Sequence, residues 1–362
     1  MEKRKVYLWL KSITSISDII IENMESQVEN IEQIFYMEDK EILNFKNINT
    51  NILKNVVKYK SLTYIEEIIE KLIKLNIDYV SIDDKNYPKN LKHIYRPPKI
   101  LYYKGNIKIV NEKLSIAMVG SRKCTQYGSN YAKVMGKKLS DNNINIVSGL
   151  ALGIDSYSHR GCIDGKSNAI AVLGSGVDNV LPKSNIKLGE KILENGGVII
   201  SEFKEGSTVY PSNFVQRNRI ISGISDGVFV VEAAKKSGAL ITVDYALEQG
   251  KNVFSLPGNI NSIMSQGCNN IINQGAKLVS DIEDILEEYN IEYINDNNQK
   301  FENIDEYGKI IINSIKNKGI LNIDEICDNT KIDIKNVNSI ISELILKNLI
   351  IENENNKYSL NI

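Results

Sequence analysis

The centre of the chain alternates short apolar runs with segments whose apolar residues recur at helical spacing. Runs such as "AIAVL" and "GVFVV" lack polar alternation, which is typical of parallel strands covered on both faces. This alternation predicts an α/β protein with a Rossmann-like, doubly wound, mostly parallel sheet. The expected strands are 115–119, 144–148, 168–173, 197–201, 227–231, 252–255 and 276–279, and the expected helices are 127–140, 154–164, 184–194, 213–224, 238–249, 267–273 and 281–288.

The two ends of the chain have other patterns. Residues 1–75 carry isoleucines at i, i+3 and i+4, which predicts a small helical domain. The central domain spans 79–290 and begins with Tyr-Pro and Pro-Pro steps, which force extended backbone and predict a strand-and-turn segment packed on the rest of that domain. The polar, asparagine-rich residues 291–304 predict a linker. Residues 305–362 predict three helices and a terminal hairpin, the pattern of a winged helix.

Composition limits the classes of protein that this chain can be. Its 362 residues suffice for two or three domains, and a formal net charge of −1 excludes a globally polycationic nucleic-acid binder but not a local basic patch. Four scattered cysteines and two isolated histidines predict neither a disulfide framework nor a metal site, and nothing requires a cofactor. No signal peptide or membrane span is expected, so we expect a cytoplasmic protein without membrane association.

Glycines follow nearly every predicted strand. Ligands of open parallel sheets bind outside the carboxyl ends of the strands, and glycine lets a phosphate approach backbone N–H groups there. Helix N-termini add a partial positive charge. One such glycine is ordinary turn chemistry, but a whole rim of them predicts phosphate binding. The rim comprises Gly120-Ser121-Arg122, "GLALGID", "GSGVDNVLPKSN", "EFKEG", "EAAKKSGALIT" and Pro257-Gly258.

Basic residues accompany this rim. Arg217 and Arg219 lie two residues apart in one predicted helix and do not share a face, so we expect different roles for them. For each, a phosphate contact and a pairing with a buried carboxylate such as Glu232 stay open. The full set of cations is Arg122, Lys183, Arg217, Arg219, Lys235 and Lys236, the last two expected on a solvated face.

A series of motifs runs through the central region in a fixed order. It begins with "MVGSR" (118–122), continues through "VSGLALGID", "AVLGSGVDNVLP", "ISEF", "RNRIISG", "VVEA", "SGALIT" and "VFSLPG", and ends with "INQGAKLV" (272–279). The series resembles the DNA-processing protein A family, also called DprA or Smf, over roughly 80–290. The N-terminal helices are compatible with a sterile-alpha-motif or helix-hairpin-helix domain, and the C-terminal winged helix is similar to one in many members.

The resemblance implies DNA binding and no catalysis. Members bind single-stranded DNA without strong sequence preference, protect incoming DNA and load RecA recombinase onto it during natural transformation. It implies homodimers joined through the Rossmann-like domains, and single-strand DNA-binding protein as a further partner. The DNA-binding residues carried over by motif are Gly120, Ser121, Arg122, Lys183, Phe214, Arg217, Asn218 and Arg219, with Phe214 offering a stacking face to a base.

One segment departs from the family pattern. Members commonly have Phe-Pro before the arginine pair, where this chain has Phe214-Val215 and an earlier Pro211. The presentation of this loop and the role of Phe214 therefore stay open. The dimer contact implied by the resemblance falls on Ile271, Ile272 and Leu278, for which a core role is an equal alternative.

Two other functions compete with this one. Cytokinin-activating phosphoribohydrolases have a related fold and a Pro-Gly-Gly-x-Gly-Thr-x-x-Glu motif. Here Tyr245 takes the place of the catalytic glutamate and Asp244 is one position off, so we expect no hydrolysis of nucleoside monophosphates. His159 is expected to be packed and not a base. A transcription factor would use the winged helix, but its longest helix offers few basic residues, which favours a protein-contact or auxiliary role.

Overall fold

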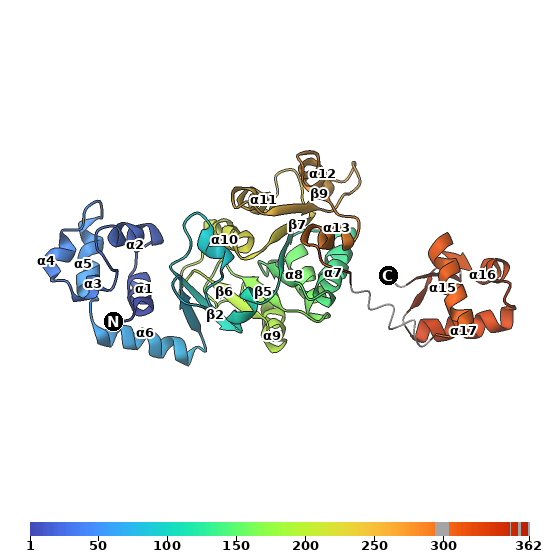
Figure 1. Ribbon diagram of the computed structural model, residues 1–362, viewed down its shortest axis with the longest axis horizontal. Coiled ribbons are helices and arrows are strands. Elements are labelled where there is room, and N and C mark those ends of the chain that lie inside the picture. Colours follow the sequence, from blue (N-terminus) through green and yellow to red (C-terminus); the bar gives the residue numbers. More distant parts are fainter. Residues whose placement is uncertain (294–303, 348, 354–355, 361–362) are drawn as a thin grey trace. The chain divides into compact units, whose positions relative to one another are not determined.

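The computed structural model describes residues 1–293, 304–347, 349–353 and 356–360 (Figure 1). The chain forms two compact units, 1–293 and 294–362. The predicted linker 291–304 falls mainly on 294–303, outside the described residues. Among the described residues no helix combines the length and the apolar character that a bilayer crossing requires.

A nine-stranded sheet in the order β1-β2-β6-β5-β4-β3-β7-β8-β9 organises the first unit. All seven predicted strands are present, and neighbours from β6 to β9 pair in parallel. The order reverses at β3, which lies between β4 and β7, as a doubly wound sheet requires. These strands are β3 (Ser115–Gly120), β4 (Asn145–Ser148), β5 (Ala169–Val172), β6 (Val198–Ser201), β7 (Gly227–Glu232), β8 (Asn252–Ser255) and β9 (Lys277–Leu278).

The proline-rich segment at the start of the central domain extends the sheet itself. Its strands β1 (Asp78–Ser81) and β2 (Ile100–Gly105) pair antiparallel with each other, and β2 pairs antiparallel with β6. The sequence predicted a segment packed on the domain; the structure makes it the edge of the sheet, because the backbone groups of β2 bond to those of β6.

Helices cover both faces of the sheet. Alternate residues of each strand point to opposite faces: in β3, Ile116 and Met118 join one core, and Ala117 and Val119 join the other. This explains the uninterrupted apolar runs in the sequence. The first core contains side chains of α7 (Gln126–Asp141), α8 (Ile154–Ile163), α9 (Ile186–Glu194) and α13 (Glu283–Leu286), and the second those of α10 (Pro211–Ile224), α11 (Ala239–Glu248) and α12 (Gln266–Asn273).

The N-terminal helices continue the first core. Val6, Leu8 and Trp9 of α1 are fully buried, and α1 contacts β1 and β2. The Lys99 ammonium group lies 2.7 Å from a carboxylate oxygen of Glu25, which ties the helices to the start of β2. The helices are α1 (Lys3–Ser12), α2 (Asp18–Glu25), α3 (Gln33–Tyr36), α4 (Asp39–Leu43), α5 (Thr50–Lys58) and α6 (Leu62–Lys74).

The C-terminal unit has its own hydrophobic core. Ile311, Ile326 and Leu344 come from its three helices and meet there. The predicted helices and the two hairpin strands are present, and a short additional strand, β10, joins them in an antiparallel sheet in the order β10-β12-β11. The elements are α15 (Glu306–Lys318), β10 (Leu321–Asn322), α16 (Ile323–Thr330), α17 (Ile334–Leu346), β11 (Ile350–Asn353) and β12 (Lys357–Leu360).

Candidate functional site

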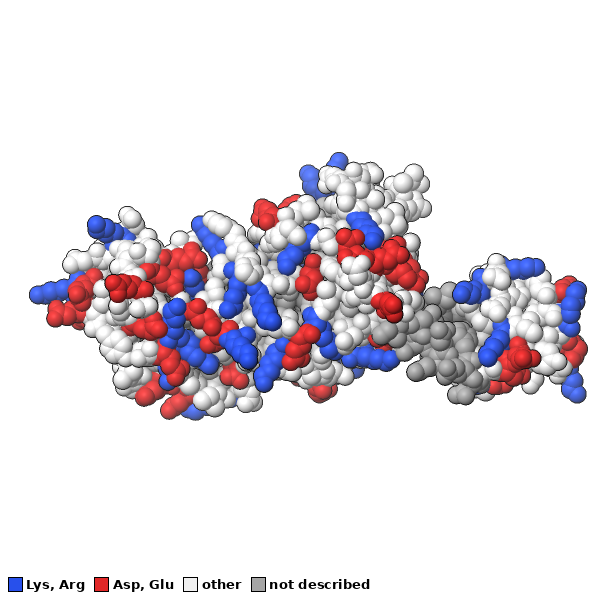
Figure 2. All heavy atoms as spheres, viewed as in Figure 1, with Lys and Arg blue, Asp and Glu red and all other residues white. Residues whose placement is uncertain are grey.

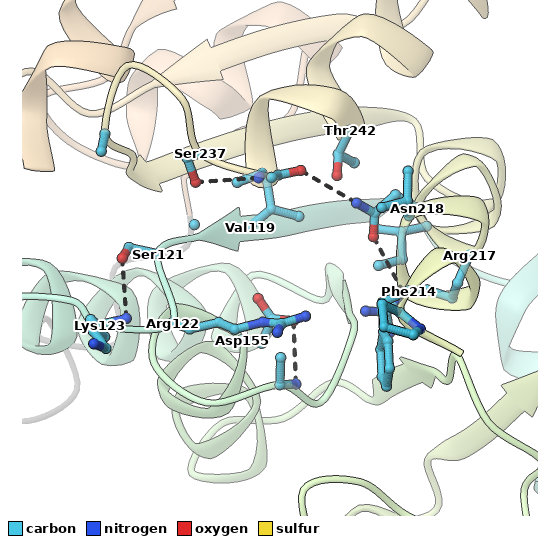
Figure 3. Close-up of a pocket in the computed structure, with 18 of the residues that line it drawn as sticks. Val119, Ser121, Arg122, Lys123, Asp155, Phe214, Arg217, Asn218, Ser237 and Thr242 are labelled. Atoms are coloured by element: carbon cyan, nitrogen blue, oxygen red, sulfur yellow. Dashed lines mark hydrogen bonds between the residues drawn. The ribbon is translucent and has the colours of Figure 1, made fainter. Parts of the chain in front are cut away.

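A pocket of about 580 Å³ opens where the strand order reverses (Figure 3). The loops that leave β3 and β7 run to opposite faces of the sheet and leave a crevice between them, as the topology dictates. We name it the switch-point pocket. Its lining comes from the end of β3 and the loop after it (119–123), from the β4–α8 loop and the start of α8, from α10, and from the segment 234–242 after β7.

Six of the eight residues expected from the sequence line this pocket. They come from segments almost a hundred positions apart and meet because β3 ends, and α10 begins, at the same edge of the sheet. Lys183 does not line it; it is exposed, in the short helix η3 (Lys183–Asn185) after β5. Arg219 does not line it either. The six residues are Gly120, Ser121, Arg122, Phe214, Arg217 and Asn218.

The glycines of these loops are needed for packing. A Cβ atom on Gly120 would lie 2.6 Å from a side-chain carbon of Ile154 and 2.7 Å from the Glu232 carbonyl oxygen. Gly153 has φ +74°, and a Cβ atom there would lie 2.2 Å from the Ser121 carbonyl oxygen. That carbonyl accepts a hydrogen bond from the Ile154 N–H at 3.2 Å. The start of α8 therefore holds the Ser121 loop in place.

Arg122 reaches across the pocket toward Phe214. The two side chains come from opposite sides and point toward one another (Figure 3), with the guanidinium carbon 5.6 Å from the centre of the ring. Arg122 and Lys123 are both exposed, and no salt bridge of the described residues involves Arg122. Ser121 Oγ accepts a hydrogen bond from the Lys123 N–H at 3.1 Å, which fixes the turn. The pocket therefore presents accessible positive charge beside an aromatic ring.

Arg217 is a buried positioning residue. Only 3% of it is exposed, and its Nη1 donates hydrogen bonds to the Gly149 carbonyl oxygen at 2.8 Å and to the Val172 carbonyl oxygen. Burial lowers its pKa to about 10, against the opposing effect of Asp155. Arg217 therefore ties α10 to the ends of β4 and β5, and at least part of its hydrogen-bonding capacity is used within the protein.

Asp155, which also lines the pocket, carries the negative charge that faces Arg217. Its carboxylate accepts hydrogen bonds from the N–H groups of Gly149 at 3.1 Å and Ala151 at 3.3 Å. Burial raises its pKa, and the charge of Arg217 opposes that shift. The carboxylate thus shapes the β4–α8 loop. Next to it, His159 is fully buried and its pKa is lowered to about 3 by burial, as expected for a packed histidine.

Arg219 takes the alternative role that the sequence left open. Its guanidinium pairs with Glu202, whose side chain is 2% exposed, and its Nη1 donates a hydrogen bond to the Arg96 carbonyl oxygen at 2.9 Å. The carboxylate partner is thus Glu202 and not Glu232. Glu232 instead accepts hydrogen bonds from the N–H and the hydroxyl of Thr125, both at 2.7 Å, where α7 begins.

The other expected residues lie elsewhere. Ile271 is buried in the core beneath α12, Ile272 is half-buried, and Leu278 on β9 is 44% exposed. Thr242 lines the switch-point pocket but Asp244 and Tyr245 do not. Asp155 is the one carboxylate among the described residues that line it, and it accepts hydrogen bonds from the N–H groups of Gly149 and Ala151. The acid of a phosphoribohydrolase therefore has no counterpart at the position that its motif requires.

Lys123 and Met264 also line the pocket and were missed by sequence reasoning. Lys123 directly follows the Gly-Ser-Arg motif, and this position in the sequence could have identified it as a residue of the pocket. Met264 belongs to the short helix η4 (Ile263–Ser265), far along the chain, and no pattern indicated it.

The chain is similar to known proteins in sequence. The sequence profile of the family described as DNA recombination-mediator protein A matches residues 78–290. DNA processing protein DprA of Streptococcus pneumoniae is 41% identical over 209 residues, which cover 58% of this chain and 73% of that protein. DprA of Bacillus subtilis is 38% identical over 220 residues, which cover 60% of this chain and 74% of that protein.

Solved structures agree with the sequence relatives. The X-ray structure of S. pneumoniae DprA has a TM-score of 0.68 and 32% identity, and the likeness covers 81% of this chain and 99% of that one. DNA processing protein A of Helicobacter pylori, described for its single-stranded DNA binding mode, has a TM-score of 0.54 and 28% identity, covering 61% and 99%. With its profile matched over more than half of its length, the chain belongs to the DNA recombination-mediator protein A (DprA/Smf) family.

Proposed function

We propose that this protein binds single-stranded DNA in the switch-point pocket, without strong sequence preference. The observation that carries the proposal is the exposed Arg122 guanidinium beside the Phe214 ring, above loops packed through glycine. A cation that meets phosphates and a ring that stacks on bases are the two parts of a sequence-tolerant single-strand site. Family membership and the single-stranded DNA binding mode described for the H. pylori relative support it.

In this proposal the residues of the pocket have different roles in DNA binding. Arg122 and Lys123 supply charge for the phosphates, and the start of α11 at Ala239 adds the partial positive charge of a helix N-terminus. Phe214 supplies the stacking face, and Arg217 holds the loops beneath. On the face of the 1–293 unit seen in Figure 2, Lys and Arg side chains gather over the middle, and acidic side chains crowd over the N-terminal helices. Within the pocket, the exposed Arg122 and Lys123 favour a polyanion despite the net charge of −1.

We extend the proposal to the cellular role and the assembly. The protein protects incoming DNA and loads RecA recombinase onto it during natural transformation in the cytoplasm, with single-strand DNA-binding protein as a further partner. It acts as a homodimer joined near Leu278 and Ile272, since β9 is the last strand of the sheet and Leu278 is exposed.

The proposal also covers the two ends of the chain. The N-terminal helices form a sterile-alpha-motif or helix-hairpin-helix type of domain, and the C-terminal unit is a winged helix with an auxiliary role. The separate core of the C-terminal unit supports this organisation.

A gel-shift titration tests the central claim. Wild type should bind oligo-dT more tightly than duplex DNA, and Arg122→Ala should weaken oligo-dT binding by about tenfold or more, because a charged contact is lost. The variant should also reduce the salt slope by about 0.7 log units per tenfold salt for one phosphate contact.

Arg160→Ala is the matched control. Arg160 is exposed and lies over the ring of Tyr157, a cation–π pair like that of Arg122, but it does not line the pocket. Its removal should leave oligo-dT affinity unchanged. Equal losses in the two variants, or oligo-dT binding that does not respond to salt, would contradict the proposed site.

A further inference from the structure

A second pocket, of about 600 Å³, borders the other face of α10. Gln216 and Arg219 of α10 line it, whereas Phe214, Arg217 and Asn218 of the same helix line the switch-point pocket. The remaining lining comes from the loop 93–96, the α1–α2 region and the end of α11. We name it the Tyr95 pocket. Helix α10 is thus the wall between two pockets, which explains why the two arginines on it have different partners.

Tyr95 stands at this pocket with its ring open to solvent. The residue is 76% exposed. The guanidinium carbon of Arg96 lies 4.8 Å from the centre of its ring. An aromatic ring with an arginine beside it is the pair of groups on which unpaired bases stack in single-strand binding proteins.

The backbone that carries Tyr95 is strained and braced. Arg96 has φ +53°, a left-handed conformation that is rare for residues other than glycine, and it is followed by Pro97. Such backbone persists only where the surrounding structure holds it. The Arg219 hydrogen bond to the Arg96 carbonyl oxygen does so, and Arg219 is in turn fixed by the buried Glu202. Arg219 is therefore a positioning residue for the Tyr95 loop.

The other polar groups of the pocket include the carboxylate of Glu248, a charged pair and an uncharged amide. Lys11 and Asp18 pair with each other at 3.1 Å, which leaves little net charge at that end. Gln249 donates a hydrogen bond from Nε2 to the Arg219 carbonyl oxygen at 3.1 Å, while its buried Oε1 has no partner among the described residues. Because this oxygen is buried, the amide gives the pocket an uncharged wall and not a contact to the edge of a base.

We propose that the Tyr95 pocket binds a base of the same DNA strand whose phosphates occupy the switch-point pocket. The inference rests on the proposed function. An α-helix with its side chains is about 10 Å across, so a strand of a few nucleotides that crosses α10 can fill both pockets. A strand too short to cross α10 fills one pocket only. The base stacks on Tyr95, and Arg96 supports the ring.

Fluorescence anisotropy with oligo-dT of two lengths tests the second pocket. With a long oligonucleotide of about 16 nucleotides, Tyr95→Ala should weaken binding by about 5- to 150-fold, the range for loss of one base–aromatic stack. With a dinucleotide, which at about 3.4 Å per nucleotide is too short to cross the helix, the affinity of the variant should match wild type. Tyr95→Phe should behave as wild type at both lengths. Tyr36→Ala, which removes a 68% exposed tyrosine outside both pockets, is the matched control and should have no effect.

A fluorescent variant reports on the stack itself. The one natural tryptophan, Trp9, is fully buried, so the signal that Tyr95→Trp adds comes from the pocket. The long oligonucleotide should quench this signal and the short one should not. If Arg122→Ala weakens binding but Tyr95→Ala binds the long strand as wild type does and Tyr95→Trp is not quenched, the second pocket is refuted and the proposed function stands. If wild type binds neither length, the proposed function itself has failed.

Discussion

At the scale of single residues, the two arginines that line the switch-point pocket show how burial separates similar side chains. Arg217 of α10 is buried and bonded to the carbonyl oxygens of Gly149 and Val172, whereas Arg122, on a different loop, is exposed beside a ring. A buried guanidinium that holds carbonyl groups contributes to folding, and an exposed one contributes to binding. Replacing each should therefore change a different measured property.

Arg217→Ala should lower the free energy of unfolding by about 3 kcal/mol or more, because two buried carbonyl groups lose their donor and Asp155 loses the charge that balances it. Arg122→Ala should change it by less than about 0.5 kcal/mol, as is usual for an exposed residue. Urea unfolding monitored by circular dichroism measures both. Equal stability of the two variants would contradict the positioning role of Arg217.

At the scale of elements, the start of α8 and the loop after β3 form one packed unit. Gly153 precedes α8 with φ +74°, and its missing Cβ leaves room for the Ser121 carbonyl oxygen. The glycine therefore sets the position of the loop that carries Arg122. In this way the β4–α8 connection, whose sequence is "GLALGID", controls a group that belongs to another strand.

We expect Gly153→Ala to destabilise the protein by more than about 1 kcal/mol and to weaken oligo-dT binding, since the new methyl group would displace the Ser121–Arg122 segment. Gly250→Ala is its control: φ is +66° there as well, but nothing lies within 4 Å of the added Cβ. It should carry the conformational penalty and leave DNA affinity unchanged. Thermal unfolding of the two variants measures the cost of backbone strain, and anisotropy titrations with oligo-dT measure the effect of displacing the Ser121–Arg122 segment.

At the scale of the whole molecule, the two units have separate cores. Both pockets are lined by residues of the 1–293 unit alone. In the C-terminal unit acidic residues outnumber lysines, and none of its residues lines either pocket. Binding of single-stranded DNA should therefore depend on the first unit, and duplex binding through the winged helix should not account for it.

Removal of 305–362 should accordingly leave oligo-dT affinity within about twofold of the full chain, because separately packed parts that share no contacts at the site contribute independently. The truncated protein should keep the unfolding transition of the first unit. A loss of single-strand binding on truncation, measured by gel shift, would instead favour the winged helix as the DNA-binding element.

The sequence by itself determined the sheet and the position of the main pocket. Uninterrupted apolar runs marked all seven parallel strands because both faces of each strand are covered, and the Gly-Ser-Arg motif came directly after the strand at which the order reverses. These features are local, so they can be read along the chain. Strand β2, second from the edge of the sheet, was harder to assign, since its place in the sheet depends on pairing with β6, almost a hundred residues later.

Only the tertiary structure decided which residue of α10 meets which partner. Arg217 and Arg219 differ by two positions in the sequence, but one lies over Gly149 and Val172 and the other between Glu202 and Arg96. The left-handed Arg96 next to Tyr95 likewise has its carbonyl oxygen bonded by Arg219, a residue far along the chain. Burial and hydrogen bonding are set by groups that are distant along the chain, and no local pattern of residues encodes which of them a side chain will reach.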